Sequence, residues 1–104
     1  MSQHTTICKE GEGGNILESS QVNFADVINE LYKFAGFQTE YPWIATINPY
    51  GDTVFNQIQI PLVIADLKKL KERTYDLKLQ EDLRTVLSFL SKVDLHEYIR
   101  FIGD

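Results

Sequence analysis

The sequence is poor in the residues that usually carry metal or disulfide chemistry. Its 104 residues include one cysteine, Cys8, and two histidines, His4 and His96. A single thiol forms no intramolecular disulfide, and these three side chains lack the ligand spacing typical of zinc or iron sites. We therefore expect no metal and no cofactor, and we expect Cys8 to be a buried structural thiol.

The sequence also lacks a long apolar run. No segment approaches the roughly 18 apolar residues that a membrane-spanning helix requires. The N-terminus has neither the basic region nor the apolar stretch of a secretory signal. Because 43% of the residues are hydrophobic and 24% are charged, the composition is that of a globular protein rather than a disordered one. We expect a single domain over residues 1–104, located in the cytoplasm.

Basic residues are scarce in the first two thirds of the chain. Residues 1–67 contain two basic and eight acidic side chains, a charge of −6, whereas residues 68–104 carry +1. The densest basic group, between Lys68 and Arg73, falls on a predicted helix and fans around its solvent side. Since an acidic chain repels a phosphate backbone, we expect no nucleic-acid partner.

The N-terminal half begins with a predicted hairpin and a predicted helix. Residues 5–18 contain two short apolar runs around a glycine-rich centre, a pattern typical of a loose hairpin. Apolar residues then follow the 3.6-residue period over 23–35. Asn23 is suited to the N-cap of this helix, and Gly36 to a left-handed residue after its end.

A second hairpin is predicted in the middle of the chain. Segments 43–48 and 52–58 are rich in β-branched and aromatic residues, and they flank the tetrapeptide NPYG at 48–51. That tetrapeptide fits a type I turn, in which the Asn48 side chain bonds to the backbone and Gly51 adopts a left-handed conformation.

The C-terminal part predicts two helices and a strand. The first helix begins at Pro61 and ends near Arg73, and the second, capped by Asp76, ends near Val93. Alternating side chains over 95–102 predict a final strand. Together the elements indicate an α+β domain, with a mostly antiparallel sheet of about five strands and three helices packed on one face.

Polar and aromatic side chains are concentrated in residues 37–56. Such mixtures are typical of partner-binding surfaces, because aromatics supply contact area while amides and carboxylates direct hydrogen bonds. The candidate partner- or ligand-binding residues are Tyr41, Trp43, Asn48, Tyr50, Asp52, Thr53 and Asn56. Under the alternative interpretation, the aromatic residues belong to the core and the polar ones satisfy backbone groups in turns. No set of catalytic residues is identified.

The segment INPYGDTVFNQIQIP, residues 47–61, resembles a segment of small uncharacterised bacterial proteins in which PYGDTxFN precedes a polar-apolar run and a helix. A weaker similarity covers the closing YIRFIGD, residues 98–104. This resemblance implies a bacterial accessory protein of the type carried on mobile gene cassettes or encoded beside toxin genes. It implies no activity and no active-site residues.

These observations favour a non-catalytic protein-binding module, and immunity to a basic toxin is one form of that function. The acidic first part would steer a basic partner toward the protein. One alternative is a small-molecule-binding protein or minor enzyme with a pocket lined by Tyr41, Trp43 and Tyr50. A further alternative is a structural homodimer joined along an exposed final strand.

Overall fold

The computed structural model describes residues 4–103. Residues 1–3, which were part of the sequence examined for a secretory signal, and residue 104 lie outside this range. In chain order the elements are β1 (Thr5–Glu10), β2 (Ile16–Ser19), α1 (Ala25–Leu31), α2 (Phe37–Glu40), the 3-10 helix η1 (Ile44–Thr46), β3 (Asp52–Phe55), α3 (Ile60–Arg73), α4 (Leu77–Ser91) and β4 (Tyr98–Gly103). The predicted α+β class is confirmed.

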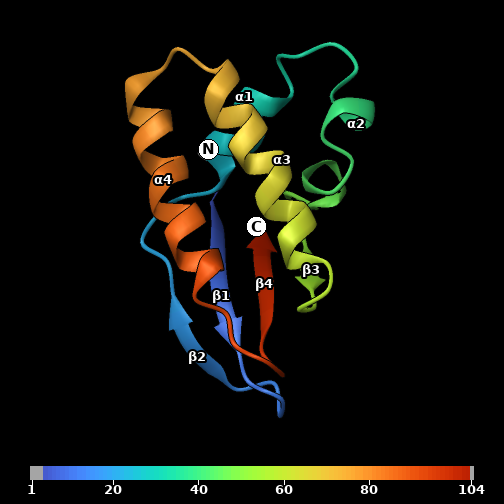
Figure 1. Ribbon diagram of the computed structural model, residues 1–104, viewed down its shortest axis with the longest axis vertical. Helices are drawn as coiled ribbons and strands as arrows, with labels where there is room; N and C mark the ends of the chain where they lie inside the picture. Colours follow the sequence, from blue (N-terminus) through green and yellow to red (C-terminus); the bar gives the residue numbers. More distant parts are fainter. Residues whose placement is uncertain (1–3, 104) are drawn as a thin grey trace.

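The strands of the described residues form one antiparallel sheet in the order β2-β1-β4-β3 (Figure 1). The sheet therefore has four strands rather than about five. The final strand is shorter than the predicted 95–102, and it lies in the middle of the sheet, where it pairs with both β1 and β3. The edges of the sheet are β2 and β3, so β4 has no unpaired edge. A homodimer joined along the final strand, as the sequence suggested, therefore cannot form in this sheet.

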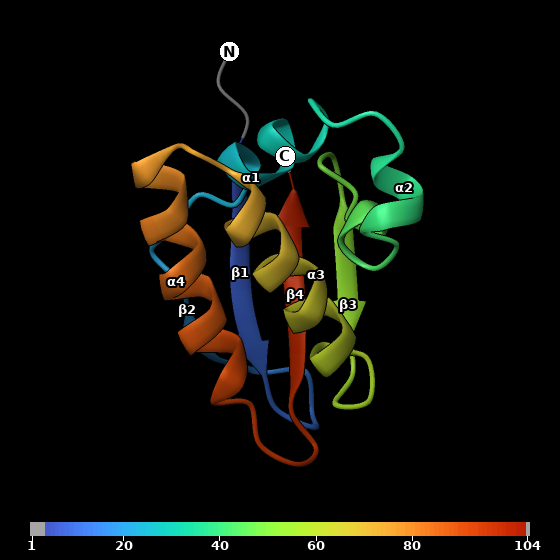
Figure 2. The same cartoon turned by 45° about the horizontal axis from the view of Figure 1, so that its top comes forward.

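The two predicted C-terminal helices are present as α3 and α4, which form an antiparallel pair and lie over one face of the sheet (Figure 2). Pro61 occupies the first turn of α3. Backbone N–H groups in the first turn have no acceptor within the helix, so the N–H that proline lacks is not needed there. At the start of α4, Asp76 Oδ1 accepts the N–H of Leu79 at 3.2 Å. Besides the three longer helices that were expected, the described chain contains the four-residue α2 and η1.

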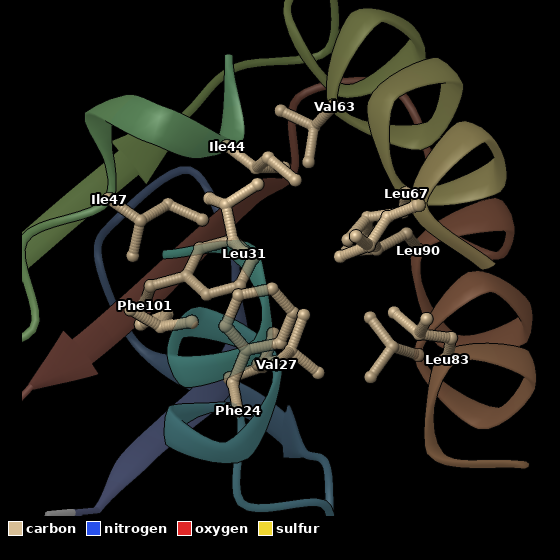
Figure 3. Packing of buried hydrophobic residues seen from close by; sticks show 14 of the residues in the cluster. Phe24, Val27, Leu31, Ile44, Ile47, Val63, Leu67, Leu83, Leu90 and Phe101 are labelled. Carbon is tan, nitrogen blue, oxygen red and sulfur yellow. The ribbon is translucent and has the colours of Figure 1, made fainter. Parts of the chain in front are cut away.

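The core lies between the inner face of the sheet and the helices. Phe101 of β4 is fully buried, and its ring meets Phe24 at 4.8 Å and Phe55 at 5.7 Å between centroids. Figure 3 shows Phe24 and Phe101 opposite Leu67 and Leu90, which project from the inward stripes of α3 and α4. Along β4, Ile99 and Phe101 point into the core, and the residues that alternate with them point to the opposite face of the sheet.

The first hairpin is confirmed as β1 and β2, while the first helix is shorter than predicted. The N-cap of α1 is Phe24 and not Asn23 as predicted. Asn23 Oδ1 accepts the N–H of Ala25 at 3.1 Å and that of Thr5 at 3.0 Å, so this side chain ties the start of the helix to β1. After Leu31 the α-helical bonding stops at Tyr32, and the N–H groups of Lys33 and Phe34 bond to carbonyls three residues back. Gly36 has φ 75°, left-handed as predicted.

The predicted strand at 43–48 is wrong. Asp66 of α3 is buried, and its Oδ2 accepts the N–H of Trp43 at 2.8 Å and of Ile44 at 3.2 Å. These two bonds hold the start of η1, and both Ile44 and Ile47 are buried in the core. A carboxylate distant in sequence therefore overrides the β-propensity of this segment.

The turn at 48–51 exists, but it does not close a hairpin. Asn48 Oδ1 accepts the N–H of Tyr50 at 2.9 Å, as the sequence predicts. Gly51 is not among the described residues with positive φ, so its predicted left-handed conformation is wrong. Its carbonyl instead accepts the N–H of Gly103 at 2.8 Å. The predicted strand 52–58 ends early, as β3, and pairs with β4.

Gly103 packs against this turn so closely that we expect Gly103→Ala to lower the free energy of unfolding by about 1–3 kcal/mol. A Cβ at this position would lie 2.8 Å from the carbonyl oxygen of Asn48, and closer still to that of Pro49. Both are backbone atoms, so the turn itself must move. Urea denaturation measures the change.

The matched control is Gly13→Ala, because a Cβ there would meet only Asn15 Oδ1, at 3.7 Å. We expect this control to change stability by no more than about 0.5 kcal/mol. Equal stability of the two variants would show that the turn is not packed on the end of β4.

Candidate functional site

Three of the predicted binding residues are engaged in local backbone structure. Asn48 caps the turn described above, and Thr53 Oγ1 accepts the N–H of Asn48 at 2.9 Å. Asn56 Oδ1 accepts two N–H groups at 3.0 Å in the turn that leads into α3. Their hydrogen bonds match the structural alternative given for these residues.

The predicted aromatic pocket is not formed by its three residues. Tyr41 has 0% exposure and belongs to the core, with Lys69 Nζ placed 5.1 Å from its ring centroid. Trp43 is partly buried against the same core. Tyr50, by contrast, is 71% exposed. Tyr41 is therefore not accessible to a ligand, whereas Tyr50 is exposed to solvent.

Part of the basic run holds α2 in place. Lys69 Nζ donates to the carbonyl of Glu40 at 2.8 Å, and the Arg73 guanidinium binds the Glu40 carboxylate and lies 4.4 Å from the Phe34 ring centroid. Tyr41 and Glu40 together raise the pKa of Arg73 above its ordinary value. Of the four basic residues between positions 68 and 73, Lys69 and Arg73 therefore stabilise the packing of α2 against α3.

One face of the sheet is turned away from α3 and α4 (Figures 1 and 2). We call it the open face. Register and alternation place ten side chains on it: Thr6, Cys8, Glu10, Ile16, Ser19, Asp52, Val54, Tyr98, Arg100 and Ile102. Among them Ile16, Val54 and Tyr98 are exposed hydrophobic residues. An antiparallel sheet covered on one side leaves such a face available to another molecule.

A charged network crosses the centre of the open face. Arg100 Nε donates to Glu10 Oε2 at 2.6 Å, and Arg100 Nη1 donates to Asp52 Oδ2 at 3.0 Å. The bond to Glu10, followed by that to Asp52, raises the pKa of Arg100 above its ordinary value. Glu10 is buried, whereas the Asp52 side chain is 48% exposed. Two carboxylates around one guanidinium leave a net negative centre whose accessible group is Asp52.

Cys8 lies on the open face but has only 3% exposure. Its Sγ lies 3.4 Å from Ser19 Oγ on the neighbouring strand. The prediction of a buried structural thiol is therefore confirmed.

Sequence reasoning found Tyr50 and Asp52 but missed the contribution of β4. The alternation in the tail already placed Tyr98, Arg100 and Ile102 on one side of a strand. The missing information was that this strand is central, because pairing on both sides is what brings Arg100 between Glu10 and Asp52.

Across residues 4–103, no group of three or more histidine, cysteine, aspartate or glutamate side chains is placed to hold a metal ion. None of the helices in this range has the length and apolar character needed to cross a membrane. Compared with known proteins, the chain matches no family model, no curated protein and no solved structure.

Proposed function

We propose that the protein is a non-catalytic module that binds a basic partner protein on the open face of its sheet. The observation that carries this proposal is the contrast between the two faces. One face is filled by α3 and α4, whereas the other exposes Ile16, Val54 and Tyr98 around a carboxylate-rich centre. Exposed apolar residues grouped on one surface mark interaction sites.

The residue types on this face suit a protein interface. Tyrosine and arginine are enriched among residues that dominate binding energy, and here Tyr98 and Arg100 lie two residues apart on the central strand. Arg100 is held by two carboxylates, so its guanidinium is ordered before a partner arrives. A preordered side chain loses less conformational entropy on binding.

The charge of the face sets the chemistry of the partner. On the open face itself, Glu10 and Asp52 with Arg100 leave a net charge of −1, and residues 1–67, which include both of these carboxylates, carry −6. Opposite charge accelerates association and disfavours acidic competitors. A basic toxin bound by its immunity protein is one pair of this kind. Tyr50, two residues before Asp52, is largely exposed in the turn that leads into β3.

We expect Tyr98→Ala, Tyr50→Ala and Asp52→Ala each to weaken the complex by about 2 kcal/mol, roughly thirtyfold, with little effect on folding. The partner is captured on the immobilised protein from a lysate of the source organism, and the purified pair is measured by calorimetry. Weaker binding at raised ionic strength is expected for Asp52-dependent recognition.

Tyr75→Ala is the matched control, because this tyrosine is 96% exposed in the connection between α3 and α4. It should leave affinity unchanged. If Tyr98→Ala and Asp52→Ala, the two variants on the open face, bind as tightly as this control, the partner does not dock on the open face and the proposal is wrong.

A further inference from the structure

A groove runs along α4 on the side of the connection from β2 to α1, and it is separate from the open face. Its volume is about 480 Å³, within the range of small-molecule sites. Figures 1 and 2 both place that connection beside α4. The residues used below are Ser20 from the connection and Arg84, Thr85, Ser88, Phe89 and Lys92 from α4.

The spacing of these residues on α4 orders the groove from end to end. Arg84, Ser88 and Lys92 are four residues apart, so they lie along one side of the helix, with the two cations about 12 Å apart at Cα. Phe89 is partly buried against the core and gives the groove an apolar wall between them. Hydroxyl groups of Ser20, Thr85 and Ser88 line the same space.

The two cations are available to a ligand. Within residues 4–103, Lys92 makes no ion pair, and Arg84 pairs only with Glu81, where both side chains are 65% exposed. An ion pair this exposed contributes little and exchanges readily. Glu18 also lines the groove, and it pairs at 3.5 Å with Lys9, which is shared with Glu97 at 3.9 Å. The lining side chains Arg84, Lys92 and Glu18 together leave the groove a net charge of +1.

We propose that this groove binds a small organic dianion, with one carboxylate or phosphate at Arg84, another at Lys92, and an apolar body against Phe89. Charge complementarity fixes the two ends of the ligand, because a cation lies at each end of the groove and Phe89 lies between them. The hydroxyl groups donate or accept hydrogen bonds along the body of the ligand. This site replaces the pocket that the sequence placed among Tyr41, Trp43 and Tyr50, and it is independent of the proposed protein interface.

Two dicarboxylates serve as probes, the rigid biphenyl-4,4′-dicarboxylate and the flexible decanedioate. Binding is followed by amide chemical shifts in a ¹H–¹⁵N titration of the whole protein. We expect saturable shifts at residues of α4 and at Ser20 for at least one probe. Arg84→Gln and Lys92→Gln should each weaken that binding about three- to tenfold.

Two controls separate this site from general attraction of anions to lysine. The uncharged diamide of the same probe should not bind, and Lys33→Gln, which removes an exposed lysine that pairs with Glu30 away from the groove, should leave affinity unchanged. Failure of both dicarboxylates to saturate below about 10 mM overturns the proposal. Equal weakening by Lys33→Gln also overturns it, because the binding would then follow net charge alone.

Discussion

Phe101→Ala is expected to lower the free energy of unfolding by about 3–5 kcal/mol. Phe101 is fully buried on the central strand, and its ring contacts Phe24 before α1 and Phe55 on β3. Removing the ring leaves a cavity where three parts of the chain meet. The cost exceeds the loss of transfer free energy alone, since neighbouring backbone elements cannot close the space completely.

Urea denaturation followed by circular dichroism measures this effect. Phe101→Leu keeps most of the volume and should cost less than the alanine variant. Tyr98→Ala provides a control on the same strand but on the open face, with an expected cost below about 1 kcal/mol. Similar losses for Phe101→Ala and Tyr98→Ala would contradict the assignment of one buried and one open face.

Asp66→Ala is expected to destabilise the protein by about 2–4 kcal/mol. The carboxylate accepts two backbone N–H groups, those of Trp43 and Ile44, and the substitution leaves both without a partner in a largely buried place. Because Asp66 joins α3 to η1, the loss is expected to begin locally, with η1 detaching from the helix. Asp66→Asn retains an acceptor oxygen and should restore part of the stability.

Trp43 makes this prediction directly observable, because it is the one tryptophan of the chain. Its fluorescence should report unfolding at a lower urea concentration in Asp66→Ala than in the unchanged protein. Glu72→Ala removes an exposed carboxylate from the same helix and should shift the midpoint only slightly. An Asp66→Ala midpoint equal to that of Glu72→Ala would show that the two hydrogen bonds do not stabilise η1.

The two proposed sites lie on different layers of the molecule and use opposite charges. The open face presents Asp52 and Tyr98 from the sheet, whereas the groove presents Arg84 and Lys92 from α4. A partner protein and a small dianion can therefore bind without competing. Substitutions at one site should leave the other unchanged, because the sites share no residue.

The helices were predictable because their signals are local. Pro61 and Asp76 mark the starts of α3 and α4, and apolar residues recur at helical spacing after each of them. The turn at 48–51 was also recognisable, since the Asn48 side chain bonds within the turn itself. Helix caps and turns depend on residues fewer than about five positions apart, so they can be recognised in a single sequence.

The sequence by itself determined the α+β class, the helical pair and the first hairpin. Only the tertiary structure decided that β4 is the central partner of β1 and β3, and that segment 43–48 is not a strand. Both outcomes depend on groups far apart in the chain, such as Asp66 with Trp43 or Arg100 with Glu10. Local propensity cannot encode these pairings, because their free energy appears only when packing brings the groups together and removes them from water.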